Sequence, residues 1–331
     1  MILSIESSCD DSSIAITRLE DRAILFHKKI SQDSAHSPHG GVVPELASRL
    51  HAVALPKILE ECAPFFPHLK AIAVTNEPGL SVTLLEGVMM AKALALALHL
   101  PLIAVNHLKG HLYSLFLEQE SRFPLDVLLV SGGHTMVLHA RSFGEIEIIG
   151  QSMDDSFGES FDKVAKMLSL GYPGGPIVES YAKEGDASRF PLPLPLAGKK
   201  EVAFSFSGLK NAVRLVIQSL QNPPNEQEKR DICASFQATA IAHLIQKCRL
   251  YLATSNAPYL AIVGGASANL ALREEMERLG EHFGKKLLLA PLAYCSDNAA
   301  MIGRAALESY ALGAFTSPLE LTVRPRTPSL C

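Results

Sequence analysis

Two histidines four residues apart, His107 and His111, have the spacing in this sequence that best suits a metal ion. They follow the apolar run Leu102–Val105, which has strand character, in a segment that can be helical. Residues four apart lie on the same face of a helix, one turn from each other. Two neutral imidazoles at that spacing suit a transition-metal ion. The alternative is a helix surface that carries two of the twelve histidines of the chain, and the spacing alone leaves both interpretations open.

A second place for chemistry is the polar connection Glu6–Ser13, which separates two apolar runs. Its small residues can offer backbone N–H groups to an anion. Its adjacent carboxylates, Asp10 and Asp11, could instead hold a metal–phosphate unit. The simpler alternative is a plain polar turn. Ser131–Thr135 is a comparable turn, and its two glycines allow close backbone approach to a ligand because glycine has no Cβ.

The elements that must position these turns occur twice in the same order. We predict strands at Ile2–Ile5, Ile14–Thr17 and Ala23–Ile30, and again at Val127–Val130, Met136–Ala140 and Glu145–Gly150. A strand, a glycine turn and a helix also occur twice, at Ala71–Thr75 with Val82–Leu98 and at Tyr259–Val263 with Leu270–Leu279. A helix that begins after such a turn directs N–H groups and its dipole at a phosphate. The repetition indicates a duplicated α/β fold with a cleft between its halves.

Length and composition agree with a compact two-domain protein. The chain has 331 residues, 48% hydrophobic and 19% charged, and one core of that size is unusual. The net charge of −4 excludes a global basic field that would bind nucleic acid unaided. Without a CxxC pair, the cysteines are expected to be reduced thiols of a cytosolic protein. They are Cys9, Cys62, Cys233, Cys248, Cys295 and Cys331.

Neither a signal peptide nor a membrane span is expected. The N-terminus meets the acid Glu6 before an apolar signal core can form. The most hydrophobic window, Val88–Val105, contains Lys92, His99 and Pro101, whereas a spanning helix needs about 20 mostly apolar residues. We expect a buried helix followed by a strand, in a soluble cytoplasmic protein that uses no membrane.

The repeated order of elements resembles the actin/Hsp70/sugar-kinase (ASKHA) superfamily, and short motifs sharpen the resemblance. The motifs are Ile5–Asp11, Gly40–Arg49, Pro78–Leu80, Asn106–His107, Gly110–His111, Leu129–Thr135, Gly158–Glu159, Phe161–Lys163, Tyr172–Pro176, Phe204–Lys210, Gly264–Gly265, Ser267–Asn269, Cys295–Met301 and Val323–Arg326. In this order they make the chain similar to the TsaD/Gcp (YgjD) family, the tRNA N6-adenosine threonylcarbamoyltransferases. The similarity runs almost from end to end of the sequence.

The resemblance implies a two-lobed duplicated α/β fold of the ASKHA type with a central nucleotide cleft. We expect residues 1–125 plus 298–331 to form the N-terminal lobe. Residues 126–297 would form the C-terminal lobe, with an insertion at about 151–207. The implied enzyme is a metal-dependent acyltransferase. It moves the threonylcarbamoyl group from threonylcarbamoyl-AMP to the N6 amine of the adenosine 3′ of the anticodon (position 37), in tRNAs that read codons beginning with adenine, and AMP leaves.

The resemblance also implies the site residues. His107, His111 and Asp297 would bind one divalent metal, Fe(2+) or Zn(2+). Asp10 and Asp11 are candidates for activating the amine or steering the phosphate, with no choice between them. The residues that match substrate and nucleotide contacts are Leu129, Val130, Ser131, Gly132, Gly133, Asp162, Gly175, Glu179 and Asn269. Glu179 stands where many members of the family carry an aspartate. ATP or ADP is also expected to fit the cleft.

The implied partners are tRNA, a paralogous TsaB-type subunit, a TsaE-type P-loop ATPase and an upstream threonylcarbamoyl-AMP synthase. Local cations that could meet tRNA are Lys199, Lys200, Lys285, Lys286, Arg324 and Arg326. A zinc peptidase of the HExxH type is a rival function, but it needs Glu after the first histidine, where this chain has Leu108. A small-molecule kinase would need the cleft without the histidine pair and Asp297. A non-catalytic binding subunit would not need the three metal ligands.

Overall fold

The computed structural model describes residues 1–220, 222–326 and 330, and the chain divides into two compact units. Unit 1 comprises Met1–Ser121 and Ala290–Cys331, and unit 2 comprises Arg122–Leu289. Both boundaries lie earlier in the chain than the predicted 125/126 and 297/298. The second difference matters because it assigns Asp297 to the unit that contains His107 and His111, rather than to the other lobe. Cys331 lies outside the described residues.

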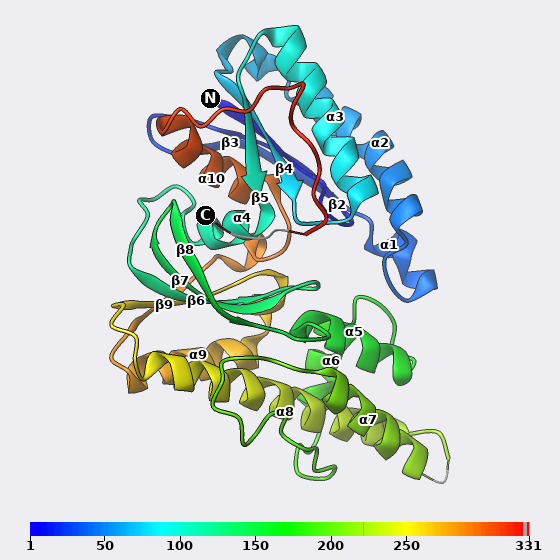
Figure 1. Ribbon diagram of the computed structural model, residues 1–331. Helices are drawn as coiled ribbons and strands as arrows, with labels where there is room; N and C mark the ends of the chain where they lie inside the picture. Colours follow the sequence, from blue (N-terminus) through cyan, green and yellow to red (C-terminus); the bar gives the residue numbers. More distant parts are fainter. Residues whose placement is uncertain (221, 327–329, 331) are drawn as a thin grey trace. The chain divides into compact units, whose positions relative to one another are not determined.

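The described residues of unit 1 form a five-stranded mixed sheet in the order β3-β2-β1-β4-β5 (Figure 1). The strands are β1 (Ile2–Glu6), β2 (Asp11–Thr17), β3 (Ile24–Ser31), β4 (Ala71–Glu77) and β5 (Leu102–Asn106). The first three strands are antiparallel, and β4 and β5 run parallel to β1. The polar connection between β1 and β2 is thus the tip of a hairpin, next to the carboxyl end of β4.

Helices cover both faces of this sheet because side chains alternate along each strand. On one face, Leu3 and Ile5 pack in a core with α2 (Pro44–Glu61) and α3 (Ser81–Leu98). On the opposite face, Ser4 donates to the Ala299 carbonyl of α10 (Ala299–Ala311). The helix α10 also packs against α4 (His107–Tyr113). The sheet therefore carries α4 and α10, the two helices closest to the histidine pair and Asp297, on one scaffold.

The described residues of unit 2 repeat this topology. A second five-stranded sheet has the order β10-β9-β6-β7-β8. Its elements are β6 (Leu125–Val130), β7 (Thr135–Ser142), β8 (Glu145–Gln151), β9 (Tyr259–Val263) and β10 (Lys286–Leu289), with helices α5 (Phe157–Met167), α6 (Gly174–Ala182), α7 (Ser207–Ser219), α8 (Glu226–Leu252) and α9 (Leu270–His282). An antiparallel hairpin sheet followed by parallel strand–helix–strand units thus occurs twice, which confirms the predicted duplicated α/β fold. The short strand β10 was not among the predicted strands.

The main difference between the units is the connection before the parallel strands. In unit 1, α1 (Asp33–His36) and α2 precede β4, whereas in unit 2 the helices α5 to α8 precede β9. The core of unit 2 joins these helices to the sheet: Phe157 and Phe161 of α5 pack with Phe236 of α8. The remaining short elements are the 3-10 turns η1 (Ser37–His39), η2 (Ala63–His68), η3 (Ser114–Phe116), η4 (Gly265–Ala268) and η5 (Leu292–Tyr294).

Among the described residues, α3 is the one helix long and apolar enough to cross a membrane by length and composition. Such a helix also occurs in the cores of water-soluble proteins. Val88 and Ala91 of α3 pack in the core of unit 1, whereas Leu85, Met89 and Leu96 are exposed. The predicted helix followed by the strand β5 is confirmed, but the helix is only partly buried. Its exposed side is an apolar face without a described partner.

Candidate functional site

The helix α4 places the two histidines on one face, as their spacing predicts. It begins at His107 because the side-chain Oδ1 of Asn106 accepts hydrogen bonds from the backbone N–H groups of Leu108 at 2.9 Å and Lys109 at 3.3 Å. An asparagine at this position satisfies N–H groups that have no partner within the helix. The ring centroids of His107 and His111 are 4.6 Å apart. The helix start thus sets the direction of both imidazoles.

Asp297, far away in the sequence, completes a group of three potential ligands. Its Oδ1 lies 3.1 Å from Nε2 of His111 and 3.4 Å from Nε2 of His107. Asp297 directly precedes Asn298, whose side chain caps α10 by accepting from the Met301 N–H at 3.0 Å. The ligand atoms of His107, His111 and Asp297 all lie within 4.8 Å of one another. Within the described part of the chain, no other group of His, Cys, Asp and Glu side chains is so arranged.

The burial and bonding of His111 fit a metal ion. His111 is fully buried, its Nδ1 has no hydrogen-bond partner among the described residues, and its Nε2 lies 3.1 Å from Oδ1 of Asp297. A buried polar atom without adequate partners costs about 1–3 kcal/mol, and a metal ion bound by Nε2 and the Asp297 carboxylate would satisfy both groups. Two imidazoles and one carboxylate are a donor set that iron and zinc accept, and they leave coordination positions open. The three residues therefore fit the metal that the resemblance implies.

The ionisable side chains of this group shift one another's pKa values. Burial favours the neutral form of His107, but the carboxylates of Asp297 and Glu6 outweigh it and hold the pKa of His107 well above its usual value. Burial, together with the neighbouring His107, lowers the pKa of His111. Burial opposes ionisation of Asp297, yet the two histidines hold its pKa well below the usual range. The carboxylate is thus kept ionised, as a metal ligand must be.

Glu6 extends the group on the far side of His107. This fully buried residue ends β1, and its Oε2 lies 3.1 Å from Nδ1 of His107. The same oxygen accepts a hydrogen bond from the Thr75 hydroxyl at 2.5 Å, and Oε1 accepts from the Ser8 N–H at 2.6 Å. Glu6 was not among the predicted site residues. The signal was an acid at the end of a mostly apolar strand, which predicts a buried carboxylate with specific partners.

Asp11 lies near the same group through a lysine bridge. Nζ of Lys29 donates to Asp11 Oδ2 at 2.8 Å and to the hydroxyl of Ser296 at 3.0 Å, and Ser296 precedes Asp297. Burial raises the pKa of Asp11 to about 7, although Lys29 opposes the rise. Burial also raises the pKa of Asp10. Both carboxylates are therefore easier to protonate than a surface aspartate.

Unit 2 contains a cavity of about 210 Å³ that collects five of the predicted substrate residues. They are Gly132, Asp162, Gly175, Glu179 and Asn269. The other predicted residues contribute differently. Leu129 and Val130 are buried within β6, Ser131 is buried with its hydroxyl accepting from the His134 N–H, and Gly133 is exposed. The structure thus brings together the predicted residues that come from α5, α6 and the two glycine turns.

Close backbone packing shapes one wall of this cavity. A Cβ on Gly158 would lie 2.5 Å from the carbonyl oxygen of Ser131, so only glycine fits at this position without a shift. Ser156 caps α5 by accepting from the Glu159 N–H at 3.0 Å, and its hydroxyl donates to the Gly132 carbonyl at 2.6 Å. These contacts fix the start of α5 against the turn that follows β6.

Polar side chains beside two helix starts also line this cavity. Asp162 accepts from the Gly174 N–H of α6 at 2.7 Å, and Glu179 accepts from the Leu270 N–H of α9 at 2.8 Å. Asn269 accepts from the Leu272 N–H at 2.9 Å. The expectation that the start of α9 directs these N–H groups at a phosphate is therefore wrong for Leu270 and Leu272, because side chains of the protein already bind them.

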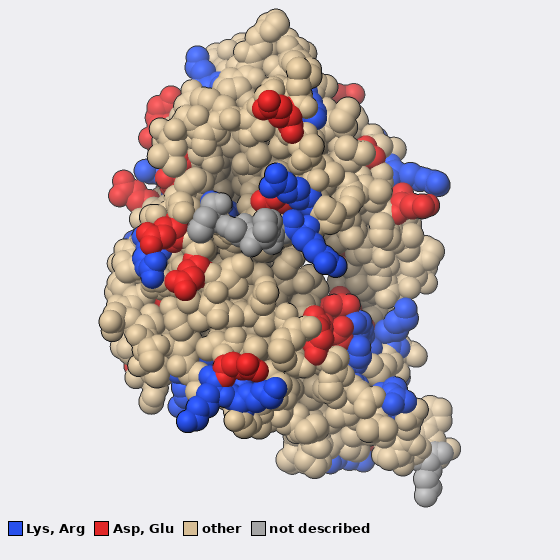
Figure 2. Space-filling view, in the orientation of Figure 1, with Lys and Arg blue, Asp and Glu red and all other residues tan. Residues whose placement is uncertain are grey.

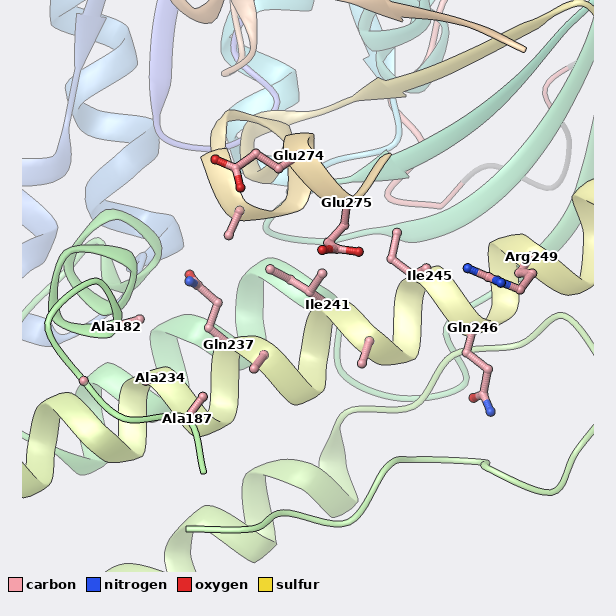
Figure 3. A pocket seen from close by; sticks show the side chains of 14 residues that line it. Ala182, Ala187, Ala234, Gln237, Ile241, Ile245, Gln246, Arg249, Glu274 and Glu275 are labelled. Carbon is pink, nitrogen blue, oxygen red and sulfur yellow. The ribbon is translucent and has the colours of Figure 1, made fainter. Parts of the chain in front are cut away.

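A larger hollow of about 680 Å³ lies between α8 and α9 (Figure 3). Small side chains one helical turn apart, Ala234, Ala238 and Ala242, make room for it, and Ile241 and Ile245 point into it. The hollow adjoins the smaller cavity through Gln237, whose Oε1 accepts from the side-chain amide of Asn269 at 2.8 Å. This hollow was not predicted from the sequence, because alanines on a helix are equally typical of a packed core.

Several cations of the chain, including two of those predicted to meet tRNA, are paired. Lys285 is buried and binds Asp126 at 3.1 Å inside unit 2, so the expectation that it meets tRNA is wrong. Arg324 lies 3.6 Å from Glu77. Lys163 and Lys210 share the carboxylate of Asp155, at 2.5 and 2.7 Å. On the face drawn in Figure 2, basic and acidic side chains of the described residues lie in small neighbouring groups. Such a surface does not create a continuous basic field.

Comparison with known proteins adds independent evidence. The sequence model of one family, described as "TsaD: tRNA N6-adenosine threonylcarbamoyltransferase", matches residues 23–304. A protein of a Nitratiruptor species with that enzyme name is 62% identical over 99% of both chains. One of Helicobacter acinonychis (strain Sheeba) with the same name is 56% identical over 99% of this chain and 98% of its own.

Solved structures of low sequence identity share the fold. T. kodakarensis HypF superposes with a TM-score of 0.66 at 12% identity, over 97% of this chain and 49% of that chain. Component A of the (R)-2-hydroxyglutaryl-CoA dehydratase of Acidaminococcus fermentans gives 0.55 at 14% identity, over 95% and 98%. These similarities show the ASKHA-type α/β fold, as predicted, and carry no information on the reaction.

Proposed function

Because the chain belongs to the TsaD family of tRNA N6-adenosine threonylcarbamoyltransferases, we propose that it performs this reaction with His107, His111 and Asp297 as the ligands of its metal. The protein is a transferase that modifies tRNA, in keeping with its relatives. The observation that carries the metal assignment is the close approach of the buried Nε2 of His111 to the ionised carboxylate of Asp297, at 3.1 Å.

The proposed reaction is acyl transfer from threonylcarbamoyl-AMP to the N6 amine of the adenosine 3′ of the anticodon. The amine nitrogen forms a bond to the carbamoyl carbon, the bond from that carbon to the phosphate oxygen breaks, and AMP leaves. The amine loses one proton in the process. Such a step needs stabilisation of the charge that develops on the carbonyl oxygen and an acceptor for the proton.

A divalent iron or zinc ion bound by the three ligands would supply a Lewis acid for that carbonyl. The neighbouring residues do not support the rival peptidase. Leu108, which follows His107, is buried and has no group that could act as a base. A kinase would not require the ligand group of His107, His111 and Asp297. The same group argues against a non-catalytic binding subunit.

We propose Asp11 as the acceptor of the proton. Its pKa of about 7 is close to neutral pH, where a general base works best. The link from Asp11 through Lys29 to Ser296 ties it to the segment that carries Asp297. Asp10 also has a raised pKa. Because the Lys29 bridge runs to Asp11, we assign Asp10 to steering the phosphate.

We propose that the 210 Å³ cavity of unit 2 binds the nucleoside part of the adenylate. Two carboxylates, Asp162 and Glu179, line it together with Asn269 and Gly175. Each carboxylate can accept several hydrogen bonds, so the bonds to Gly174 and Leu270 leave capacity for ribose hydroxyls. ATP or ADP would bind there through the same contacts.

The protein works with partners in this proposal. Its exposed apolar residues Leu85, Met89 and Leu96 on α3, with Val53 on α2, form a face that a paralogous TsaB-type subunit would cover. Exposed apolar patches typically mark such interfaces. The net charge of −4 favours tRNA binding shared with other subunits, and a TsaE-type ATPase and an upstream threonylcarbamoyl-AMP synthase complete the system. We place all of these steps in the cytoplasm.

The proposal is tested by supplying the purified protein and its partner subunits with tRNA and threonylcarbamoyl-AMP. We expect threonylcarbamoyladenosine in the tRNA and AMP in equal amounts, and loss of both with His111→Ala. Formation of ADP from ATP and a small alcohol, or cleavage of a peptide, without tRNA modification would contradict it.

A further inference from the structure

The side chain of Glu6 is enclosed where two strands and a helix meet. It ends β1, its neighbour Thr75 lies on the adjacent strand β4, and His107 begins α4. A fully buried carboxylate is unfavourable unless hydrogen bonds compensate for the lost water. Three groups do so: the Ser8 N–H, the Thr75 hydroxyl and Nδ1 of His107.

The two ring nitrogens of His107 face different surroundings. Nδ1 lies 3.1 Å from Oε2 of Glu6 and 3.2 Å from the hydroxyl of Ser8. Nε2 lies on the side of Asp297, 3.4 Å from its Oδ1. In a neutral imidazole one nitrogen carries the proton and the other has the lone pair that a metal binds. Which nitrogen carries the proton therefore decides whether Nε2 can act as a ligand.

Glu6 and Ser8 constrain the tautomer of His107 differently. An ionised carboxylate only accepts hydrogen bonds, whereas a hydroxyl can donate or accept. His107 must therefore carry its proton on Nδ1 to bond to Glu6, but it could bond to Ser8 in either tautomer. Two other donors already bond to this carboxylate, the Ser8 N–H to Oε1 and the Thr75 hydroxyl to Oε2. Both of its oxygens thus act as acceptors.

We propose that Glu6 is a positioning residue of the metal centre: its carboxylate accepts the Nδ1–H of His107, which leaves the lone pair of Nε2 directed toward the ligand group. This inference rests on the proposed function, because it presumes that His107 is a ligand. Carboxylates behind metal-bound histidines typically contribute about 10- to 100-fold in metal affinity. We expect an effect of that size here.

The variant Glu6→Gln separates this role from packing, because glutamine has nearly the same shape. The Ser8 N–H is a fixed donor, so the amide oxygen must face it, and the amide NH₂ then faces Thr75 and His107. The Thr75 hydroxyl can turn to accept that hydrogen. Nδ1 of His107 must also accept, which moves the ring proton to Nε2 and blocks the metal. Ser8→Ala is the matched control, since it removes a contact to Nδ1 that leaves both tautomers allowed.

The affinity of metal-free protein for Zn²⁺ is measured by competition with a coloured chelator, and the absorption spectrum of bound Co²⁺ reports the ligand geometry. We expect Glu6→Gln to lose about 10- to 100-fold in Zn²⁺ affinity and to change the Co²⁺ spectrum. Ser8→Ala should stay within about threefold of the unchanged protein, and Glu6→Asp should recover part of the loss. Thermal unfolding of the metal-free variants checks that each is folded.

The outcomes separate this inference from the proposed function. If His111→Ala loses Zn²⁺ while Glu6→Gln binds it as tightly as the unchanged protein, the role of Glu6 is wrong and the metal site stands. An equal loss of Zn²⁺ affinity in Glu6→Gln and Ser8→Ala also overturns the proposed role of Glu6, because packing around the His107 ring would then explain both losses. If the unchanged protein and His111→Ala bind Zn²⁺ equally, the proposed metal site itself fails.

Discussion

The carboxylate oxygen Oδ1 of Asp297 lies 3.1 Å from Nε2 of His111, although the two residues belong to distant parts of the sequence. Asp297 immediately precedes the cap of α10, and α10 packs on the sheet that also carries α4. Ser4 and Gly303 hold α10 close to that sheet, since a Cβ on Gly303 would lie 2.9 Å from the Ser4 hydroxyl oxygen. The distance between the two ligands is thus set by helix-on-sheet packing.

Replacing His111 by alanine should abolish metal binding. One imidazole of a three-residue ligand set is removed, and two protein ligands rarely retain a catalytic metal. We expect the metal content of purified protein to fall from about one ion per chain to nearly none, with loss of tRNA modification. Elemental analysis and a transfer assay measure both. His99→Asn, at an exposed histidine with φ of 53° at the end of α3, should change neither, and equal metal content in all three proteins would refute the ligand assignment.

Replacing Asp11 by asparagine should stabilise the metal-free protein at alkaline pH. The raised pKa means that the folded state holds the proton more tightly than the unfolded state. The contribution of Asp11 to stability is therefore fully present below about pH 4 and is lost as pH rises through about 7. A tenfold change in proton affinity corresponds to about 1.4 kcal/mol, so removing the charge should add up to about 4 kcal/mol at pH 8.

Thermal unfolding of both metal-free proteins from pH 4 to 8 checks the sign of this effect. The melting temperatures should coincide near pH 4 and diverge by several degrees near pH 8, with the variant higher. The same variant should lose the rise of kcat/KM with pH near neutrality, because the proposed base is absent. A lower melting temperature for the variant at pH 8 would contradict the raised pKa.

Replacing Gly158 by alanine should damage the nucleotide cavity of unit 2. The added Cβ would lie 2.5 Å from the Ser131 carbonyl oxygen, which forces the start of α5 away from the turn after β6. We expect a loss of about 1–3 kcal/mol in stability and weaker binding of a non-hydrolysable threonylcarbamoyl-adenylate analogue, measured by calorimetry. Gly144→Ala is the control, since nothing lies within 4 Å of its Cβ position. Equal analogue affinity in both variants would exclude this cavity as the binding site.

Charges on the apolar side of α3 should prevent assembly with the TsaB-type partner. Leu85 and Met89 are about half exposed, so the double variant Leu85→Glu with Met89→Glu should lose little stability as an isolated chain. In the complex, the interface would bury the two charges, which is unfavourable. We expect at least about a tenfold loss in partner affinity, with unchanged metal content. Calorimetric titration with the partner subunit measures it. Leu312→Glu, on an exposed residue of the same unit, should bind normally, and normal binding by the double variant would place the interface elsewhere.

Periodicity and spacing predicted much of this architecture. The apolar runs in β1 and β2 and the apolar pattern of α3 define their elements locally, and the four-residue spacing predicts that His107 and His111 share a face. The resemblance to the family, rather than a local pattern, predicted Asp297 and the residues that line the cavity. No local pattern could indicate that Asp297 belongs to unit 1, because that depends on where α10 packs.

Contacts between distant elements account for what the sequence could not predict. Glu6 faces His107 only because the end of β1 meets the start of α4, and a strand of four residues such as β10 has too short a pattern to distinguish it from a loop. The pair of Lys285 and Asp126 is buried, whereas charged residues in a sequence are normally assigned to the surface. Likewise, Glu179 of α6 binds the N–H of Leu270 at the start of α9, a contact that no spacing in α6 implies.

Asn106 determines how the metal site responds to residues inserted in the sequence. It is the last residue of β5 and the cap of α4, and its side-chain amide also lies 3.3 Å from Glu77 of β4. The strand β5 and the helix α4 thus meet directly, with no linker that could compensate for an inserted or deleted residue. One residue inserted between Asn106 and His107 would turn both imidazoles by about 100° around the helix axis, whereas an insertion after Tyr113 would leave them in place. The metal site should therefore tolerate residues inserted after α4, but not residues inserted between β5 and α4.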